Sequence, residues 1–213
     1  MSLERQNDDH AALEAARQGD RTQLEELLAH HRERLRRMVQ FRMDRRVQGR
    51  VDASDVIQEA YAEAFTRLDE YARDASVPFY VWLRFLTNQK LAQVHRQHLG
   101  VQARDAARDV PLGGGATASE TSAMLATQLV GQLTTPSEAA VRAEAQAQLQ
   151  AALEDMDDVD REILVLRHFE QMTHVETAAA LEITESAATS RYVRALQRLK
   201  GVLSAVPHAT GDL

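Results

Sequence analysis

The chain has 213 residues, no cysteine and a net charge of −7. This length allows one or two domains with real cores, and the absence of cysteine excludes disulfides, thiolate zinc sites and cysteine nucleophiles. No apolar run approaches the ~20 residues that a bilayer-spanning helix needs, and no basic-plus-apolar leader opens the chain. We therefore expect a soluble, cytoplasmic protein without a membrane partner.

The acidic balance argues at first sight against nucleic acid as a partner, but the charge lies in blocks. Residues 30–50 and 76–100 are basic, whereas residues 1–29, 51–75 and 151–200 are acidic. Such alternation indicates separate surfaces for an anionic partner and a cationic one, although solvated helix faces alone give part of the same pattern.

Two helices are predicted at the start of the chain. The first covers about residues 9–18 and stops at Gly19. The second starts at a capping box formed by Asp20 and Gln23 and continues toward Met43. A solvated face and a polymerase or DNA surface are both open interpretations of the arginines on its outer side and the following turn, which are Arg32, Arg34, Arg36, Arg37, Arg42, Arg45, Arg46 and Arg50.

A third helix is predicted after the N-cap Asp52. Its apolar positions share one face and are Ile57, Tyr61, Ala64, Phe65 and Leu68. The opposite face forms a compact acidic and amide patch in solvent, made of Asp55, Gln58, Glu59 and Ala62. Asp55 also fits a purely structural role, because an acid in the first turn is favourable to the helix dipole.

A fourth helix follows Pro78 and ends at Gly100; it contains basic residues and no acid. Cations beside aromatic rings suit single-stranded nucleic acid, since bases stack on rings while phosphates meet the charges. The rings near its start belong mostly to the core, because Phe79, Trp82, Leu83 and Leu86 cluster on one side. The contact candidates are Arg84, Asn88 and His95, which share another face, and Arg96.

A linker of uneven character is predicted next. Residues 111–115 are rich in glycine and flexible, whereas Met124, Leu125, Leu129 and Leu133 support one short amphipathic helix. Residues 135–138 combine a capping box with proline at the first helical position, which predicts a helix toward Met156.

Residues 173–200 are predicted to form a helix-turn-helix. Thr173 and Glu176 make a capping box for the first helix, and Thr184 is the N-cap of the second. The second helix has a core stripe of Ala188, Tyr192, Ala195, Leu196 and Leu199. Its other faces carry small residues near the N-terminus and arginines along one flank, which suits a DNA major groove: Ser186, Ala187, Thr189, Ser190, Arg191, Arg194 and Arg198. An ordinary basic surface helix is the alternative.

These motifs together resemble two conserved regions of bacterial sigma factors. Residues 55–61 with Trp82, Leu83 and Arg96 resemble the second region. The fourth region is resembled by residues 173–200 together with Leu153, Met156, Arg161, Leu164, Leu166, Arg167 and Phe169. With only these regions and a linker, the chain resembles an extracytoplasmic-function sigma factor. Residues 81–100, followed by Arg104, Asp105 and Ala106, resemble the branch common among planctomycetes.

The resemblance implies an all-α fold of two small helical domains. A region 2 domain would cover residues 1–100, a linker 101–134, a region 4 helix-turn-helix domain 135–206 and a disordered tail 207–213. Such a factor binds core RNA polymerase and directs promoter recognition and melting; its partners are the polymerase, duplex promoter DNA and the melted minus ten strand. An anti-sigma factor is a further candidate partner, and no cofactor, metal or enzymatic activity is implied.

The resemblance also implies roles for single residues. Asp55, Gln58, Glu59 and Ala62 would dock on the polymerase clamp, and Arg84, Asn88, His95 and Arg96 would contact the minus ten element. Residues 74–78 would hold a base flipped out of the stack. Ser186, Ala187, Thr189, Ser190, Arg191, Arg194 and Arg198 would read the minus thirty-five element, largely through DNA shape and phosphate contacts.

The sequence departs from the family pattern at several positions. Glu182 stands where the turn of the helix-turn-helix usually has glycine, and a left-handed conformation there would cost on the order of 1 kcal/mol, so a rebuilt turn is one expectation. Gln89 and Gln93 replace the usual asparagine and aspartate of minus ten recognition. Asp157 replaces a proline and is positioned to cap the next helix.

Other classes of function find less support in the sequence. His30, His31, His95 and His98 lack the clustered partners of a zinc site, and no phosphate-binding glycine loop or catalytic carboxylate pair stands out. Two alternatives without catalysis remain: a sigma mimic that sequesters an anti-sigma factor, and a helix-turn-helix regulator that works without polymerase. The first would not need the arginines of residues 186–200, and the second would not need the Asp55 patch.

Overall fold

The computed structural model describes residues 20–99, 118–133 and 139–204, together with Asp9, residues 11–16 and Gln18. These residues form helices and no strand, which confirms the expected all-α fold. The helices are α2 (Arg21–Arg42), α3 (Ala53–Arg73), α4 (Phe79–Leu99), α6 (Ala118–Leu133), α7 (Ala139–Glu154), α8 (Asp158–His168), α9 (His174–Ala180) and α10 (Glu185–Ser204). Residues 101–117, the cap at 135–138, Gly19 and the tail 207–213 lie outside the described residues.

Side-chain caps fix where several helices begin. The Asp52 carboxylate accepts from the backbone N–H of Ser54 at 2.7 Å, and that of Asp157 accepts from Val159 at 2.9 Å. Both caps confirm the prediction. Asp20 also caps α2, but its backbone N–H donates to the carbonyl of Ala15, so the second half of the predicted box does not form.

The first hydrophobic core lies among α2, α3 and α4. The buried residues of this core recur along the three helices with the helical periodicity that the sequence predicts. Tyr61 is half-buried, and its hydroxyl donates to the carbonyl of Leu28 at 2.6 Å. Phe65 was expected in this core, but it is 41% exposed because the buried stripe of α3 is narrower than predicted. The buried residues of the stripe are Val56, Ile57, Ala60, Ala64, Leu68 and Tyr71.

The second core lies among α6, α7, α8 and α10. The helix predicted around Leu125 and Leu129 is confirmed, and it begins earlier, at Ala118. Both leucines are buried in this second core, so α6 is part of the C-terminal packing and not a free tether. We call residues 20–99 the N-terminal unit, and residues 118–133 and 139–204 the C-terminal unit.

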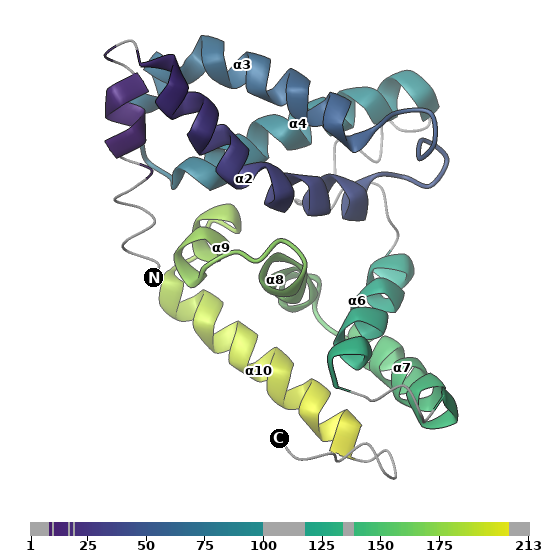
Figure 1. Cartoon of the computed structure of the whole chain (residues 1–213). Coiled ribbons are helices and arrows are strands. Elements are labelled where there is room, and N and C mark those ends of the chain that lie inside the picture. The colour runs from purple at the N-terminus through teal and green to yellow at the C-terminus, as the bar shows by residue number, and fades with distance from the viewer. Residues whose placement is uncertain are drawn as a thin grey trace.

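The two units are closed on each other. Phe41 of α2 packs into the second core, and its ring lies 4.4 Å from that of Phe169. In return Leu166, Met172 and Ala180 of the C-terminal unit pack into the first core. Figure 1 shows α8 and α9 between the layer of α2, α3 and α4 and the long helix α10. The interface is therefore made by α8 and α9, while α10 lies on the far side of them.

Candidate nucleic-acid and protein interfaces

The acidic patch of α3 is open to solvent. Asp55, Gln58, Glu59 and Ala62 are all exposed, while Ile57 on the opposite face is buried. Neither Asp55 nor Glu59 forms an ion pair with another described residue. Both carboxylates are thus available to a cationic partner, as the sequence predicted.

Two of the four candidates on α4 are covered. Arg84 is 2% exposed and His95 is 9% exposed, so neither contact candidate is accessible to DNA in this closed arrangement. Arg84 is covered by Glu170 of the C-terminal unit. His95 turns inward, and its Nε2 accepts from the backbone N–H of Asp44 at 3.2 Å. Arg96 is exposed and Asn88 is half-buried, and whether any of these residues contacts DNA stays a prediction.

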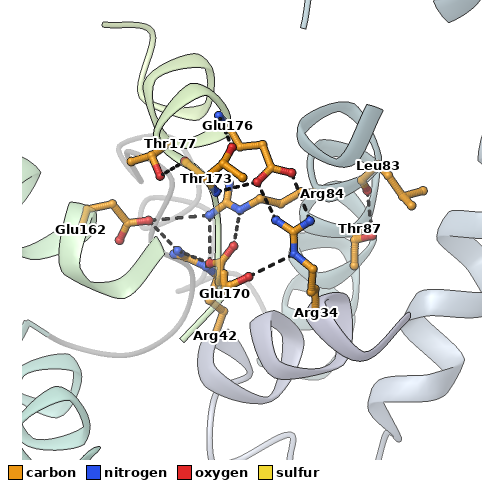
Figure 2. A network of polar contacts seen from close by, with 10 residues as sticks. All are labelled: Arg34, Arg42, Leu83, Arg84, Thr87, Glu162, Glu170, Thr173, Glu176 and Thr177. Atoms are coloured by element: carbon orange, nitrogen blue, oxygen red, sulfur yellow. Dashed lines mark hydrogen bonds and ion pairs between the residues drawn. The ribbon is translucent and has the colours of Figure 1, made fainter. Parts of the chain in front are cut away.

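A buried ionic network joins the units where Arg84 is covered (Figure 2). The carboxylate of Glu170 is fully buried and accepts from Arg84 at 2.5 and 3.2 Å and from Arg42 at 2.7 and 3.0 Å. Glu162 lies 2.5 Å from Arg42 and 3.7 Å from Arg84. Burial alone would raise the pKa of Glu170, but the charges and hydrogen bonds of Arg84 and Arg42 outweigh burial and lower the pKa to about 2. Glu170 therefore stays ionised inside the interface.

A second ionic contact lies beside this network. Nη1 and Nη2 of Arg34 donate to the two carboxylate oxygens of Glu176 at 3.1 and 2.8 Å. The same guanidinium lies 3.5 Å over the ring of Tyr80, and its Nε donates to the carbonyl oxygen of Glu170. Glu176 also closes the predicted capping box with Thr173, which is confirmed. The Glu176 carboxylate thus completes the cap of α9 and also holds that helix against α2.

Sequence reasoning missed this interface. The sequence placed Arg42 on the outer side of its helix, which is wrong because Arg42 is 1% exposed. Glu162 and Glu170 were not candidates, although one signal was present. Arg84 stands in the strongly apolar run of residues 79–86, where a solvated cation is out of place and a buried pair is the ordinary explanation. The sequence did not indicate which acid would pair with it.

A cleft of about 1180 Å³ between the turn after α2, the start of α3, and α6 is bordered by Arg32, Arg36, Arg45 and Arg46. Arg36 lies 3.7 Å from Glu33, and Arg46 lies 2.8 Å from Asp44. Acids and arginines alternate around the cleft, so it has no clear preference for an anion. Of the two interpretations of these arginines, the solvated face fits Arg32, Arg36, Arg45, Arg46 and Arg50, all of which are exposed.

The predicted reading surface of α10 is open. Ala188, Ala195 and Leu199 are buried beneath it, as the core stripe predicted. The residues of its outer faces are exposed or half-buried: Ser186, Ala187, Thr189, Ser190, Arg191, Arg194 and Arg198. The preceding turn is not rebuilt, because Glu182 adopts the left-handed φ of 55° that glycine usually supplies.

Acids of the same unit hold two of the α10 arginines. Arg191 lies 2.7 Å from Asp160, and Arg198 pairs with Asp155. Arg194 is exposed and has no ion-pair partner among the described residues. The flank of α10 therefore presents one guanidinium without an ion-pair partner, that of Arg194. A phosphate would have to displace an aspartate to bind Arg191 or Arg198.

Comparison with known proteins identifies the family. Residues 146–199 match the family model described as Sigma-70, region 4, which includes α8, α9 and most of α10. The chain is 30% identical over 200 residues to the ECF RNA polymerase sigma factor SigD of Mycobacterium tuberculosis, covering 94% of this chain and 85% of SigD. This chain belongs to the ECF sigma factor family. As an ECF sigma factor, it binds core RNA polymerase and directs promoter recognition and melting in transcription initiation.

Two further proteins are similar to the sigma factor. It is 23% identical to the RNA polymerase sigma-H factor of Pseudomonas aeruginosa, covering 93% of this chain and 95% of the other. The solved structure of CnrH in complex with the cytosolic domain of CnrY matches with a TM-score of 0.50 and 21% identity, over 93% of this chain and 98% of CnrH. That likeness supports the all-α fold. The described helices of the sigma factor include none long and apolar enough to cross a bilayer.

Proposed function

We propose that the sigma factor binds core polymerase and the minus thirty-five element through two separate surfaces of this fold. The acidic patch of α3, made of Asp55, Gln58, Glu59 and Ala62, docks on the clamp of core RNA polymerase. What supports this role is the exposure of the patch and the unpaired state of Asp55 and Glu59. A cationic or amide-rich partner surface would satisfy both carboxylates.

The second surface is the outer side of α10, which reads the minus thirty-five element. Ser186, Ala187, Thr189 and Ser190 lie in its first turns, where a helix in the major groove approaches base edges. None of these four can make the bidentate contact of arginine with guanine. Specificity therefore comes largely from DNA shape, while Arg191, Arg194 and Arg198 hold phosphates.

The minus ten element is bound by α4 and the loop before it. Arg96 and Asn88 are accessible in the closed chain, and residues 74–76 of the loop are exposed. Arg84 and His95 reach nucleic acid only after the C-terminal unit moves away from α4. The contact of α4 with the minus ten element is thus incomplete while the chain is closed, whereas the loop is accessible.

The finer assignments follow the same scheme. Residues 1–100 act as region 2 and residues 135–206 as region 4, with α6 packed on the second unit. The protein acts in the cytoplasm, and it has no enzymatic activity.

The named relatives come from Mycobacterium and Pseudomonas, so the planctomycete branch receives no support from them. A regulatory protein is a further partner, because the similar CnrH was solved with the cytosolic domain of CnrY.

The observation that carries the proposal is an open acidic patch and an open basic helix on separate units of one chain. Run-off transcription from a library of genomic fragments, with core polymerase and the purified chain, tests it. The chain should direct initiation at a defined set of fragments. Fragment binding without any transcript would favour the regulator that works without polymerase, and polymerase binding without promoter selection would favour the sigma mimic.

A further inference from the structure

One large apolar side chain lies open on the outer side of α10. Val193 is 43% exposed, whereas Ala188, Ala195 and Leu199 of the same helix are buried. Single exposed apolar residues are common on protein surfaces, so exposure alone assigns no role to Val193. The helix itself does not favour valine at this position, because β-branched side chains lose χ1 freedom in a helix.

Val193 belongs to an uncharged ridge that runs along α10. At about 100° per residue, four exposed positions fall within a narrow sector of the helix, opposite the buried stripe: Ser186, Ser190, Val193 and Gln197. We call these four residues the ridge. It faces away from the second core and carries hydroxyl groups, an amide and the methyl groups of Val193.

The arginines of α10 all lie to one side of the ridge. Arg191, Arg194 and Arg198 are turned from it by roughly 70–130° around the helix axis. Asp160 contacts Arg191 on that side, and Asp155 contacts Arg198. In a major groove, this arrangement places guanidiniums beside the phosphates of one strand while the ridge points at the base edges. The ridge therefore meets the part of DNA that carries the sequence.

The ridge is long enough to reach several base pairs. A helix rises about 1.5 Å per residue, so Val193 lies about 10 Å along the axis from Ser186. This distance corresponds to about three base pairs at 3.4 Å each. When Ser186 meets one base pair of the groove, Val193 meets a pair about three steps further along.

The chemistry of Val193 selects one partner among the base edges. Its methyl groups neither donate nor accept a hydrogen bond, and the C5 methyl of thymine is the apolar group that base pairs present in the major groove. Packing the two together removes apolar surface of both from water. Thr189, which lies one turn before Val193 and is also exposed, carries a further methyl group beside the ridge.

We propose that Val193 reads a thymine of the minus thirty-five element by packing against its C5 methyl group. This inference rests on the proposed function of α10, and it adds one direct base contact to the readout of DNA shape. The element that the sigma factor recognises therefore contains at least one thymine whose methyl group is needed for binding.

The first test removes the methyl group from the DNA and leaves the protein unchanged. The full chain, bound to core polymerase, selects promoter duplexes from a randomised pool. Each thymine of the selected minus thirty-five element is then replaced by uracil, which lacks only the C5 methyl. At one position the replacement should lower the affinity about fourfold, as expected for one methyl group lost from a buried contact. Equal affinity for thymine and uracil duplexes at every position would overturn the proposal.

The second test removes the methyl groups from the protein. Val193→Ala should lower the affinity for the thymine duplex about fourfold or more and should make the thymine and uracil duplexes equal. Val193→Thr retains one methyl group and should keep part of the difference. Thermal stability should not fall in either variant, because the side chain is exposed. A uracil effect of full size in Val193→Ala would show that another residue meets the methyl group and would overturn the assignment.

Two controls separate base reading from other effects. Arg194→Ala should lower the affinity for thymine and uracil duplexes equally, because a phosphate contact does not depend on the base. Met124→Ala removes a similarly exposed apolar side chain from α6 and should change neither affinity. A pool from which no minus thirty-five sequence is preferred would count against the proposed role of α10 itself. A preferred sequence without the uracil effect would count against Val193 alone.

Discussion

Nη1 of Arg191 in α10 lies 2.7 Å from Oδ1 of Asp160 in α8, with Asp157 at 3.4 Å. An arginine proposed to hold a phosphate is therefore held first by acids of its own unit. The pairing holds the guanidinium against α8, so DNA must displace a carboxylate to bind it. The arrangement at Arg198 and Asp155 is similar.

Releasing Arg191 should strengthen DNA binding. We expect Asp160→Asn to increase affinity for duplex DNA of any sequence while the salt slope changes little, because the contact between Arg191 and a phosphate then forms without displacing a carboxylate. The cost in stability should stay below about 1 kcal/mol, since the pair is partly exposed. Fluorescence anisotropy at several salt concentrations measures the affinity. Adding Arg191→Ala should cancel the gain; a gain that survives this change would assign it to another residue.

Removing the arginines should have the opposite effect. Arg191→Ala with Arg194→Ala should weaken promoter binding and reduce the salt slope by about 2, one contact changing the slope by about 1. Neither side chain is buried, so the thermal stability should change little. Promoter binding at several salt concentrations and run-off transcription are the measurements. Loss of transcription with DNA binding intact would give these arginines a different role.

The acidic patch should be needed for polymerase and not for folding. Asp55→Ala with Gln58→Ala should weaken binding to core polymerase while helix content and duplex DNA binding remain, because both side chains are exposed. Glu70→Ala, also exposed but further along α3, is the matched control. Pull-down and competition with core polymerase measure the effect. Unchanged affinity in the double variant would favour a regulator that acts without polymerase.

The left-handed turn at Glu182 should be improved by glycine. Its φ of 55° is accessible to glycine without a clash of Cβ, so Glu182→Gly should raise the free energy of unfolding by about 0.5–1 kcal/mol. Glu182→Ala keeps Cβ and should give no such gain. Urea denaturation compares the three proteins. Equal stability of the glycine and alanine variants would show that the turn is not strained.

Acidification should destabilise the packing around His95. Burial lowers the pKa of His95 below its ordinary value of 6.5, so the unfolded chain binds a proton that the folded chain does not. The free energy of unfolding should therefore fall as the pH drops below about 6.5. Burial also lowers the pKa of His168 and of His174, so both residues add to the loss of stability in acid. Urea denaturation at about pH 7.5 and about pH 5.5 measures this, and His95→Gln should reduce the difference; an identical difference would assign it to other groups.

Several features followed from the sequence alone because their causes are local. The caps at Asp52, Asp157 and Thr173 involve partners two or three residues away, so spacing alone predicts where α3, α8 and α9 begin. The buried stripe of α10 and the open patch of α3 follow from helical periodicity. Periodicity misplaced Phe65, at the edge of a stripe, where the ring is exposed instead of buried.

Only the tertiary structure decided what covers each face. Arg84 and Glu170 are 86 residues apart, and Arg34 and Glu176 are 142 apart, so no local pattern joins them. A helical wheel places Arg84 and Asn88 on one face, but it cannot say that α9 and Glu170 pack against it. The same holds for α6, whose apolar stripe predicts a helix without saying which core buries it. Local hydrogen bonds and helical period are set by neighbours in the chain, whereas the burial of a charge depends on a partner that folding alone brings near.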